Sequence, residues 1–165
     1  MKITDIKTTL LSFPIPEEKR WRTDLGVATK SDNCLIHVDT DTDISGFGIG
    51  FGNPEVVKSI VETQLKPSLL GENPLYVEGL WEKMYSGSRG IPSLNKGVSQ
   101  PSFSRRGDTL CAIAGIDIAL WDIVGKFFEK PIYQILGASR QRVRAYASGG
   151  WAPGDEAGEE MARYA

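Results

Sequence analysis

The sequence predicts an α+β protein, with a three-stranded antiparallel meander, then a helical bundle, then one further β/α unit. Three observations support this prediction. Strand-like segments fill the first 52 residues, helical segments follow them, and a short apolar segment at residues 142–148 is typical of a buried strand. Consecutive strands joined only by turns or loops pair antiparallel, which favours a meander over a parallel sheet.

The three strands of the meander are each marked by composition. Residues 2–13 alternate and are rich in β-branched side chains, and Pro14 and Pro16 end the segment because proline cannot donate to a sheet. Residues 34–39 (CLIHVD) and 46–51 (GFGIGF) are the second and third predicted strands. Residues 15–32, between the first two strands, are polar and aperiodic. A connection of that length inside a compact domain is usually a functional lid or a disordered segment.

Two helices are predicted directly after the strands. Pro54 lies at the first position of one helix, whose apolar residues recur at helical spacing until Pro67 stops it. Asn73-Pro74 begins the next helix, which carries Val77, Leu80, Trp81 and Met84 on one stripe.

The long helix predicted at residues 110–128 is apolar nearly all round, so we expect it to be buried on several sides. Asp108 or Thr109 is its expected N-cap. Pro131 begins a short helix that ends at Gly137, and the strand at residues 142–148 follows. We therefore divide the chain into a domain at residues 1–128 and a second part at residues 129–165.

The composition excludes several classes of function. The formal net charge is −2, which gives no electrostatic reason to expect nucleic acid or a membrane surface as a partner. No apolar segment reaches the roughly 20 residues needed to span a bilayer, and the N-terminus lacks a secretory signal. Cys34 and Cys111 lie in apolar segments far apart in the sequence, so we expect buried thiols and not a disulfide or metal pair, with a reducing compartment and a cytoplasmic location.

The glycines of the third strand do not form a nucleotide-binding motif. Gly46, Gly48, Gly50 and Gly52 alternate as G-x-G-x-G-x-G, without the spacing or the βαβ unit that a dinucleotide site requires. Alternation places these glycines on one face of the strand, and a glycine face permits close approach of a backbone or a ligand.

The polar residues that could carry chemistry have simpler interpretations. Asp39, Asp41 and Asp43 lack the glycine and glutamate of a calcium loop, so a solvated turn is expected. His37 is the only histidine and is interpreted as a strand side chain. Asp117 and Asp122 lie on the long apolar helix, where pairing with an arginine or with backbone groups is more common than metal ligation.

Several ordered motifs together resemble the mandelate racemase and muconate-lactonising branch of the enolase superfamily. These are MKITDIKT, LIHVDTDTDISGFGIGFG, PSLLGENPLYVEGLWEKMY and RRGDTLCAIAGIDIALWD, followed by VGKFFEKPIYQILG and VRAYAS. The resemblance covers nearly the whole chain, and residues 95–104 are its least similar part.

The resemblance implies a two-domain enzyme in which an N-terminal capping domain closes over a TIM-type barrel. Such enzymes abstract the proton alpha to a carboxylate and stabilise the enediolate with Mg²⁺, as acid-sugar dehydratases or racemases do. Catalytic groups of barrels lie at the ends of several strands. This chain reaches only the first barrel strand and part of its helix. The resemblance therefore implies no catalytic residue and no metal ligand in this chain, and no Mg²⁺ bound by the chain alone.

The resemblance also implies that two cap loops fold over the substrate. In this sequence they are residues 15–32, with Trp21 as a stacking surface and Arg22 as a donor to a carboxylate or hydroxyl, and the turn around Phe51 and Asn53. Ser148 would lie at the open end of the first barrel strand. The implied ligand is a small carboxylate or sugar acid, and the full-length enzyme is expected to be a homo-oligomer.

Three interpretations of the short chain remain open at this point. It is an inactive N-terminal part of such an enzyme, a non-catalytic module that completes a barrel from another polypeptide, or a stand-alone binding domain. The sequence stops inside a predicted helix at Ala165, which favours a truncated gene or record.

Overall fold

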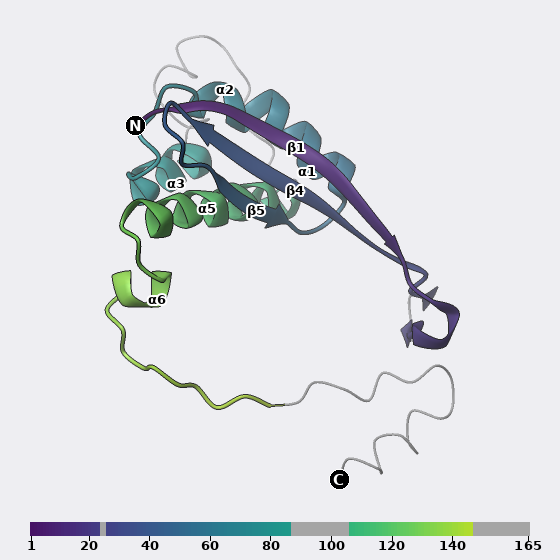
Figure 1. Ribbon diagram of the computed structural model, residues 1–165. Coiled ribbons are helices and arrows are strands. Elements are labelled where there is room, and N and C mark those ends of the chain that lie inside the picture. Colours follow the sequence, from purple (N-terminus) through teal and green to yellow (C-terminus); the bar gives the residue numbers. More distant parts are fainter. Residues whose placement is uncertain (24–25, 87–105, 147–165) are drawn as a thin grey trace. The chain divides into compact units, whose positions relative to one another are not determined.

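The computed structural model describes residues 1–23, 26–86 and 106–146 (Figure 1). The chain forms two compact units. The first contains residues 1–11 and 33–138, and the second contains residues 12–32 and 139–165.

A three-stranded sheet with the order β1-β4-β5 confirms the predicted meander. Its strands are β1 (Ile3–Pro14), β4 (Lys30–Thr40) and β5 (Gly46–Gly50). β4 and β5 pair antiparallel, with Leu35 opposite Ile49 and His37 opposite Phe47. The alternation that predicted the strands also sets burial, because Cys34, Ile36 and Val38 of β4 all point into the core.

Helices cover one face of this sheet, as Figure 1 shows. They are α1 (Pro54–Ile60), the π-helix η2 (Val61–Leu65), α2 (Lys66–Leu69), α3 (Val77–Ser86) and α5 (Arg106–Phe127). The short helix α6 (Ile132–Ile135) follows and packs against α5. Asn53 and Pro54 begin α1 as N-cap and first helical residue. The core lies between the helices and the sheet, and its fully buried residues include Ile36, Ile116 and Leu120.

Three predicted boundaries are wrong, for local reasons. Pro67 does not stop its helix, because the π-turn η2 precedes it and the helix continues to Leu69. A widened turn relieves the clash between a proline ring and the preceding carbonyl groups. Asp108 is not the N-cap of α5 but lies in its first turn, since the helix already begins at Arg106. Asn73 and Pro74 form a turn, and α3 begins only at Val77.

The strand predicted at residues 142–148 is not formed at residues 142–146, which have no regular secondary structure. A strand needs a hydrogen-bonded neighbour, and neither sheet among the described residues includes this segment. Residues 147–148 lie outside the described residues, as does the helix predicted to end at Ala165.

The glycine face of β5 lies directly against the backbone of α5. A methyl group added to Gly46 would overlap the carbonyl oxygen of Ala119, and one added to Gly48 would overlap that of Gly115. A methyl on Gly115 would in turn come within 2.8 Å of the amide nitrogen of Gly50. Of the two partners expected for this face, backbone or ligand, the structure shows backbone.

Candidate functional site

The predicted lid at residues 15–32 is not structureless. It contains the 3₁₀-helix η1 (Glu17–Lys19) and two short strands, β2 (Arg22–Thr23) and β3 (Gly26–Val27), which pair as an antiparallel hairpin. Two-residue strands are too short for an alternating pattern to reveal them. The signal available in the sequence was Gly26, whose φ of +132° is readily adopted only by glycine.

Backbone hydrogen bonds hold this hairpin at its base. The Ile15 amide donates to the Thr29 carbonyl over 2.9 Å, and the Ala28 amide donates to the Trp21 carbonyl over 2.9 Å. Arg20 Nε also donates to the Ile15 carbonyl, over 3.2 Å. Ile15 is buried beneath these contacts and gives the hairpin its small apolar centre.

The base carries a polar cluster as well. Asp32 accepts a hydrogen bond from Ser12 Oγ over 2.7 Å and pairs with Lys30 Nζ over 2.5 Å. The bond from Lys30, and then that from Ser12, lower the pKa of the Asp32 carboxyl. The carboxylate is therefore ionised at neutral pH and pairs with Lys30.

The two lid residues predicted to meet a ligand, Trp21 and Arg22, lie side by side where the hairpin begins. Trp21 is half-buried and Arg22 is exposed, opposite Val27 in the other strand. The Arg22 guanidinium has no hydrogen bond or ion pair to any described residue. An exposed guanidinium is suited to hold a carboxylate, and an indole is suited to stack on an apolar sugar face.

The second predicted lid segment follows β5. Phe51 is 69% exposed, and Gly52 has a φ of +97°, so the chain turns sharply here. Asn53 also has a structural role that was not predicted from the sequence: its Oδ1 accepts a hydrogen bond from the Glu55 amide and caps α1. Ligand contact by Phe51 and Asn53 remains a prediction. Ser148 lies outside the described residues.

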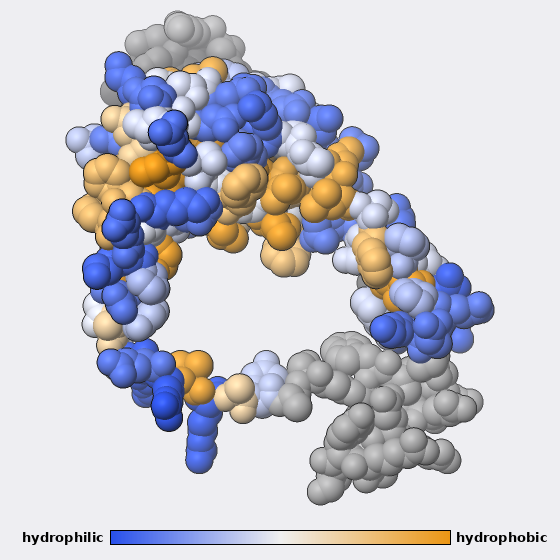
Figure 2. Space-filling view, in the orientation of Figure 1, coloured by the Kyte–Doolittle hydropathy of each residue, from blue (hydrophilic) through white to orange (hydrophobic). Residues whose placement is uncertain are grey.

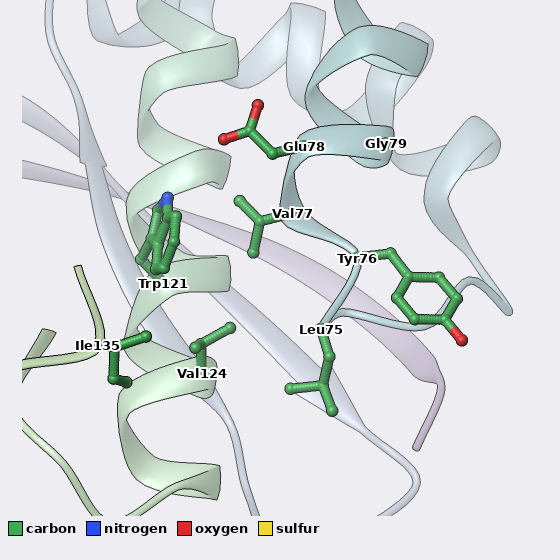
Figure 3. Close-up of a pocket in the computed structure, with 8 residues that line it drawn as sticks. All are labelled: Leu75, Tyr76, Val77, Glu78, Gly79, Trp121, Val124 and Ile135. Carbon is green, nitrogen blue, oxygen red and sulfur yellow. The ribbon is translucent and has the colours of Figure 1, made fainter. Parts of the chain in front are cut away.

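A cleft that the sequence did not reveal lies where α3, α5 and α6 meet, with a volume of about 320 Å³. Leu75, Val77, Trp121, Val124 and Ile135 line it with apolar surface, and Glu78 lies at its upper end in Figure 3. Tyr76 points away from Trp121. The cleft depends on how three separate helices pack, which the apolar stripe of each helix alone does not specify.

Two acids of α5 differ in their surroundings. Asp122 Oδ2 accepts hydrogen bonds from the Phe47 amide over 3.0 Å and from Lys126 Nζ over 2.7 Å, so the predicted pairing is confirmed for it. Asp117 has no such partner among the described residues. Burial, and secondarily the negative charge of Glu78, raise the pKa of its carboxyl.

His37 is a strand side chain, as predicted. Its ring stacks on Phe47 with a centroid distance of 4.2 Å and an interplanar angle of 9°. Its buried Nε2 lies 3.2 Å from Asp39 Oδ1 without the geometry of a hydrogen bond. Asp39 instead pairs with Lys7 Nζ over 2.6 Å, and this carboxylate raises the pKa of the Lys7 amine.

The described ranges hold neither a cluster of metal-ligating side chains nor a membrane-spanning helix. No three His, Cys, Asp or Glu side chains come close enough together there to hold a metal ion. No helix in the same ranges has the length and apolar character required to cross a bilayer.

Known proteins are similar to this chain in both sequence and fold. Residues 7–137 match the family described as mandelate racemase / muconate lactonizing enzyme, N-terminal domain. Arabinonate dehydratase from Saccharolobus solfataricus is 39% identical over 90% of this chain and 38% of its own length. D-galactonate dehydratase from Pectobacterium atrosepticum is 34% identical over 98% of this chain and 34% of its own length.

Solved structures are also similar to this chain in fold. An enolase superfamily member from Polaromonas sp. JS666 superposes with a TM-score of 0.78 at 31% identity, over 99% of this chain and 41% of that one. The chain thus spans between a third and about two fifths of the length of these relatives. With a family match over residues 7–137 and the meander and helices of the capping fold, this chain belongs to the mandelate racemase and muconate-lactonising family of the enolase superfamily, at its N-terminal domain.

Proposed function

We propose that this chain is the capping part of an enzyme that removes the proton alpha to a carboxylate, with dehydration of a sugar acid as its reaction. The observation that supports this most strongly is the 39% identity with arabinonate dehydratase across 90% of the chain. D-galactonate dehydratases match as well, and a cycloisomerase and a racemase are among the similar folds. Dehydratase is thus the favoured subtype within the proposal.

The chemistry sets what the cap must contribute. A proton alpha to a carboxylate leaves only when positive groups stabilise the developing negative charge. Loss of the 3-hydroxyl then gives an enol that becomes a 2-oxo-3-deoxy acid, with release of one water. In this proposal the Arg22 guanidinium holds a distal oxygen of the acid, Trp21 stacks on its carbon chain, and the hairpin excludes water.

Magnesium is the metal that the family implies, and it would supply charge stabilisation to the enediolate. The described residues do not fit such a site, because no group of three potential ligands occurs among them. We therefore assign no step through the metal to this chain. We propose that the base and the metal ligands belong to a barrel, and that the chain alone is therefore inactive.

The same proposal assigns the parts of the chain. Residues 1–128 form the cap, and residues 129–165 supply a linker helix and the segment that would pair as the first strand of a barrel once its neighbouring strands are present. Substrate contacts by Phe51, Asn53 and Ser148 belong to the same proposal. A cytoplasmic location and a homo-oligomer complete the proposal, and neither nucleic acid nor a membrane is a partner in it.

A domain exchange tests this function. The capping domain of Saccharolobus solfataricus arabinonate dehydratase is replaced by residues 1–138 of this chain, and formation of 2-oxo-3-deoxy acids is measured on a panel of sugar acids with Mg²⁺. We expect turnover by the chimaera and none by the 165-residue chain alone. Arg22→Ala should lower kcat/KM of the chimaera at least roughly tenfold, since it removes a charge-assisted bond.

Lys19→Ala is the matched control, because Lys19 is an exposed cation of the same unit, outside the two short strands. It should leave kcat/KM unchanged. A chimaera that is folded by circular dichroism but turns over no acid on the panel would refute the proposed function. Turnover by the chain alone would refute the assignment of the base and metal ligands to a barrel.

A further inference from the structure

β5 lies at an edge of the three-stranded sheet, with β4 as its one neighbour in that sheet. An edge strand presents backbone amides and carbonyls on its free side, and another chain can pair with them. Phe47 and Ile49 of this strand are 45% and 40% exposed, so their side chains add apolar surface to the same edge. Such an edge invites association unless something closes it.

The register shows which backbone groups face outward. The Phe47 amide donates to Asp122 and not to β4, so the pair His37 and Phe47 is the kind in which the two residues exchange no hydrogen bonds. That kind of pair brings side chains closest, in agreement with the stacked rings of His37 and Phe47. Since the pattern alternates, the amide of Ile49 also faces the free side.

Asp122 reaches this edge because the glycine face of β5 lets α5 approach closely. No side chain at Gly46 or Gly48 separates the strand from the helix backbone at Ala119 and Gly115. The Asp122 carboxylate, less than one turn beyond Ala119, then meets the outward amide of Phe47.

Lys126 holds the carboxylate in place and occupies a second backbone group. Its Nζ donates to Asp122 Oδ2 over 2.7 Å and to the Ser45 carbonyl, one residue before the strand, over 2.8 Å. The same ammonium lies 5.3 Å from the centre of the Phe47 ring. Two charged side chains one turn apart on α5 therefore cover the start of the β5 edge.

We propose that Asp122 and Lys126 close the β5 edge and so prevent two copies of this chain from pairing antiparallel through β5. Charged groups at an edge are an established means of blocking such pairing. Here the block comes from a helix beneath the sheet and not from the strand's own side chains. This proposal does not depend on the proposed function, because it concerns contacts within the described fold.

Asp122→Ala in the full chain tests the proposal. We expect this variant to self-associate with increasing concentration in sedimentation equilibrium, under conditions in which the wild type does not change its state. In dilute solution the Phe47 amide should exchange roughly tenfold faster, because it has lost its acceptor. Lys126→Met, which leaves the carboxylate present, should give a smaller increase in exchange.

Two controls separate edge pairing from other effects. Glu72→Ala removes a surface ion pair that lies away from β5, in which Lys83 Nζ is 2.5 Å from Glu72 Oε1. This variant should not cause association. Asp122→Ala combined with Ile49→Pro removes the other outward amide, which proline tolerates at an edge, and should abolish the association.

Three results would overturn the proposal. Unchanged sedimentation together with unchanged Phe47 exchange in Asp122→Ala would overturn the proposal. So would association that persists when Ile49→Pro is added, because the copies would then be meeting through another surface. If Asp122→Ala does not fold, the same two measurements on Lys126→Met decide, and no change in either would overturn the proposal.

Discussion

The two units of this chain differ in how they are held together. Twenty buried apolar residues form one cluster in the first unit, whereas Ile15 is the only buried apolar residue in the described part of the second. The first unit therefore resists change in side-chain volume, and the second is held mainly by backbone and polar contacts. Figure 2 shows that apolar surface is nevertheless exposed along the border of the first unit where α5 and β5 lie in Figure 1. Most of the apolar packing thus belongs to the first unit, and the predicted lid at residues 15–32 contributes little of it.

Gly48→Ala should break the first unit and is the largest effect we expect. Its methyl group would overlap the Gly115 carbonyl, which is backbone and cannot move without shifting α5. Overpacking of this kind costs about 3 kcal/mol or more. Urea unfolding followed by circular dichroism measures the loss. Gly79→Ala is the matched control, since nothing lies within 4 Å of its added methyl. It should stabilise the α3 helix by roughly 0.5–1 kcal/mol, and an equal loss in both variants would contradict the prediction.

Ile15→Ala should loosen the second unit and leave the first unchanged. Removing its buried side chain should lower the free energy of local opening by about 2 kcal/mol, because little else packs there. Hydrogen exchange of the Ile15 and Ala28 amides reports this opening. Val27→Ala, at an exposed position, should leave both rates as they are. A fall in the urea midpoint of the first unit would show that the two units are not independent.

Asn53→Ala should destabilise α1 by about 1 kcal/mol, because the Glu55 amide loses its cap. Thermal unfolding measures the change. Asn53→Ser retains a capping oxygen and should remain within a few tenths of a kcal/mol of the wild type. A ligand-binding role would instead be lost in both variants, so binding and stability together separate the two roles of this side chain.

Asp117→Asn should give a smaller effect that depends on pH. Burial raises the pKa of this carboxyl, so the wild type loses stability as pH rises from the unfolded-state pKa through the raised folded-state pKa. The variant should therefore melt higher than the wild type at pH 7 and about the same at low pH. Asp5→Asn is the contrasting control, because Lys66 lowers the pKa of Asp5 and its loss should reduce the melting temperature at pH 7. The same sign for both variants would contradict this account.

The sequence was sufficient to predict the meander, the long helix and the glycine face, because each rests on the composition or alternation of a single segment. Alternation places Gly46 and Gly48 on one face of the strand and Phe47 on the other, whatever surrounds the strand. The continuation of the helix through Pro67 could not be predicted, because a π-turn depends on packing and not on propensity. The strand predicted at residues 142–148 is absent at residues 142–146. The apolar character of one segment does not show whether a neighbouring strand is present to pair with it.

The candidate site was predictable only in part. The lid segment was found from its length and polarity, but the hairpin within it depends on strands of two residues each. The capping role of Asn53 could have been inferred from Pro54 directly after it. The cleft beside Trp121 and the uncompensated Asp117 depend on how α3, α5 and α6 pack, which no single segment encodes.

The two thiols give the chain reporters of its own motions. Cys34 is fully buried in β4, and burial raises its pKa, so its thiol should react with a disulfide reagent only when the sheet opens. Cys111 is half-buried on α5, and its Sγ lies 3.6 Å from where a side chain on Gly52 would begin. Its labelling rate should follow movement of the turn after β5. Comparing the two rates would thus separate breathing at the predicted lid segment from unfolding of the whole unit, without any introduced probe.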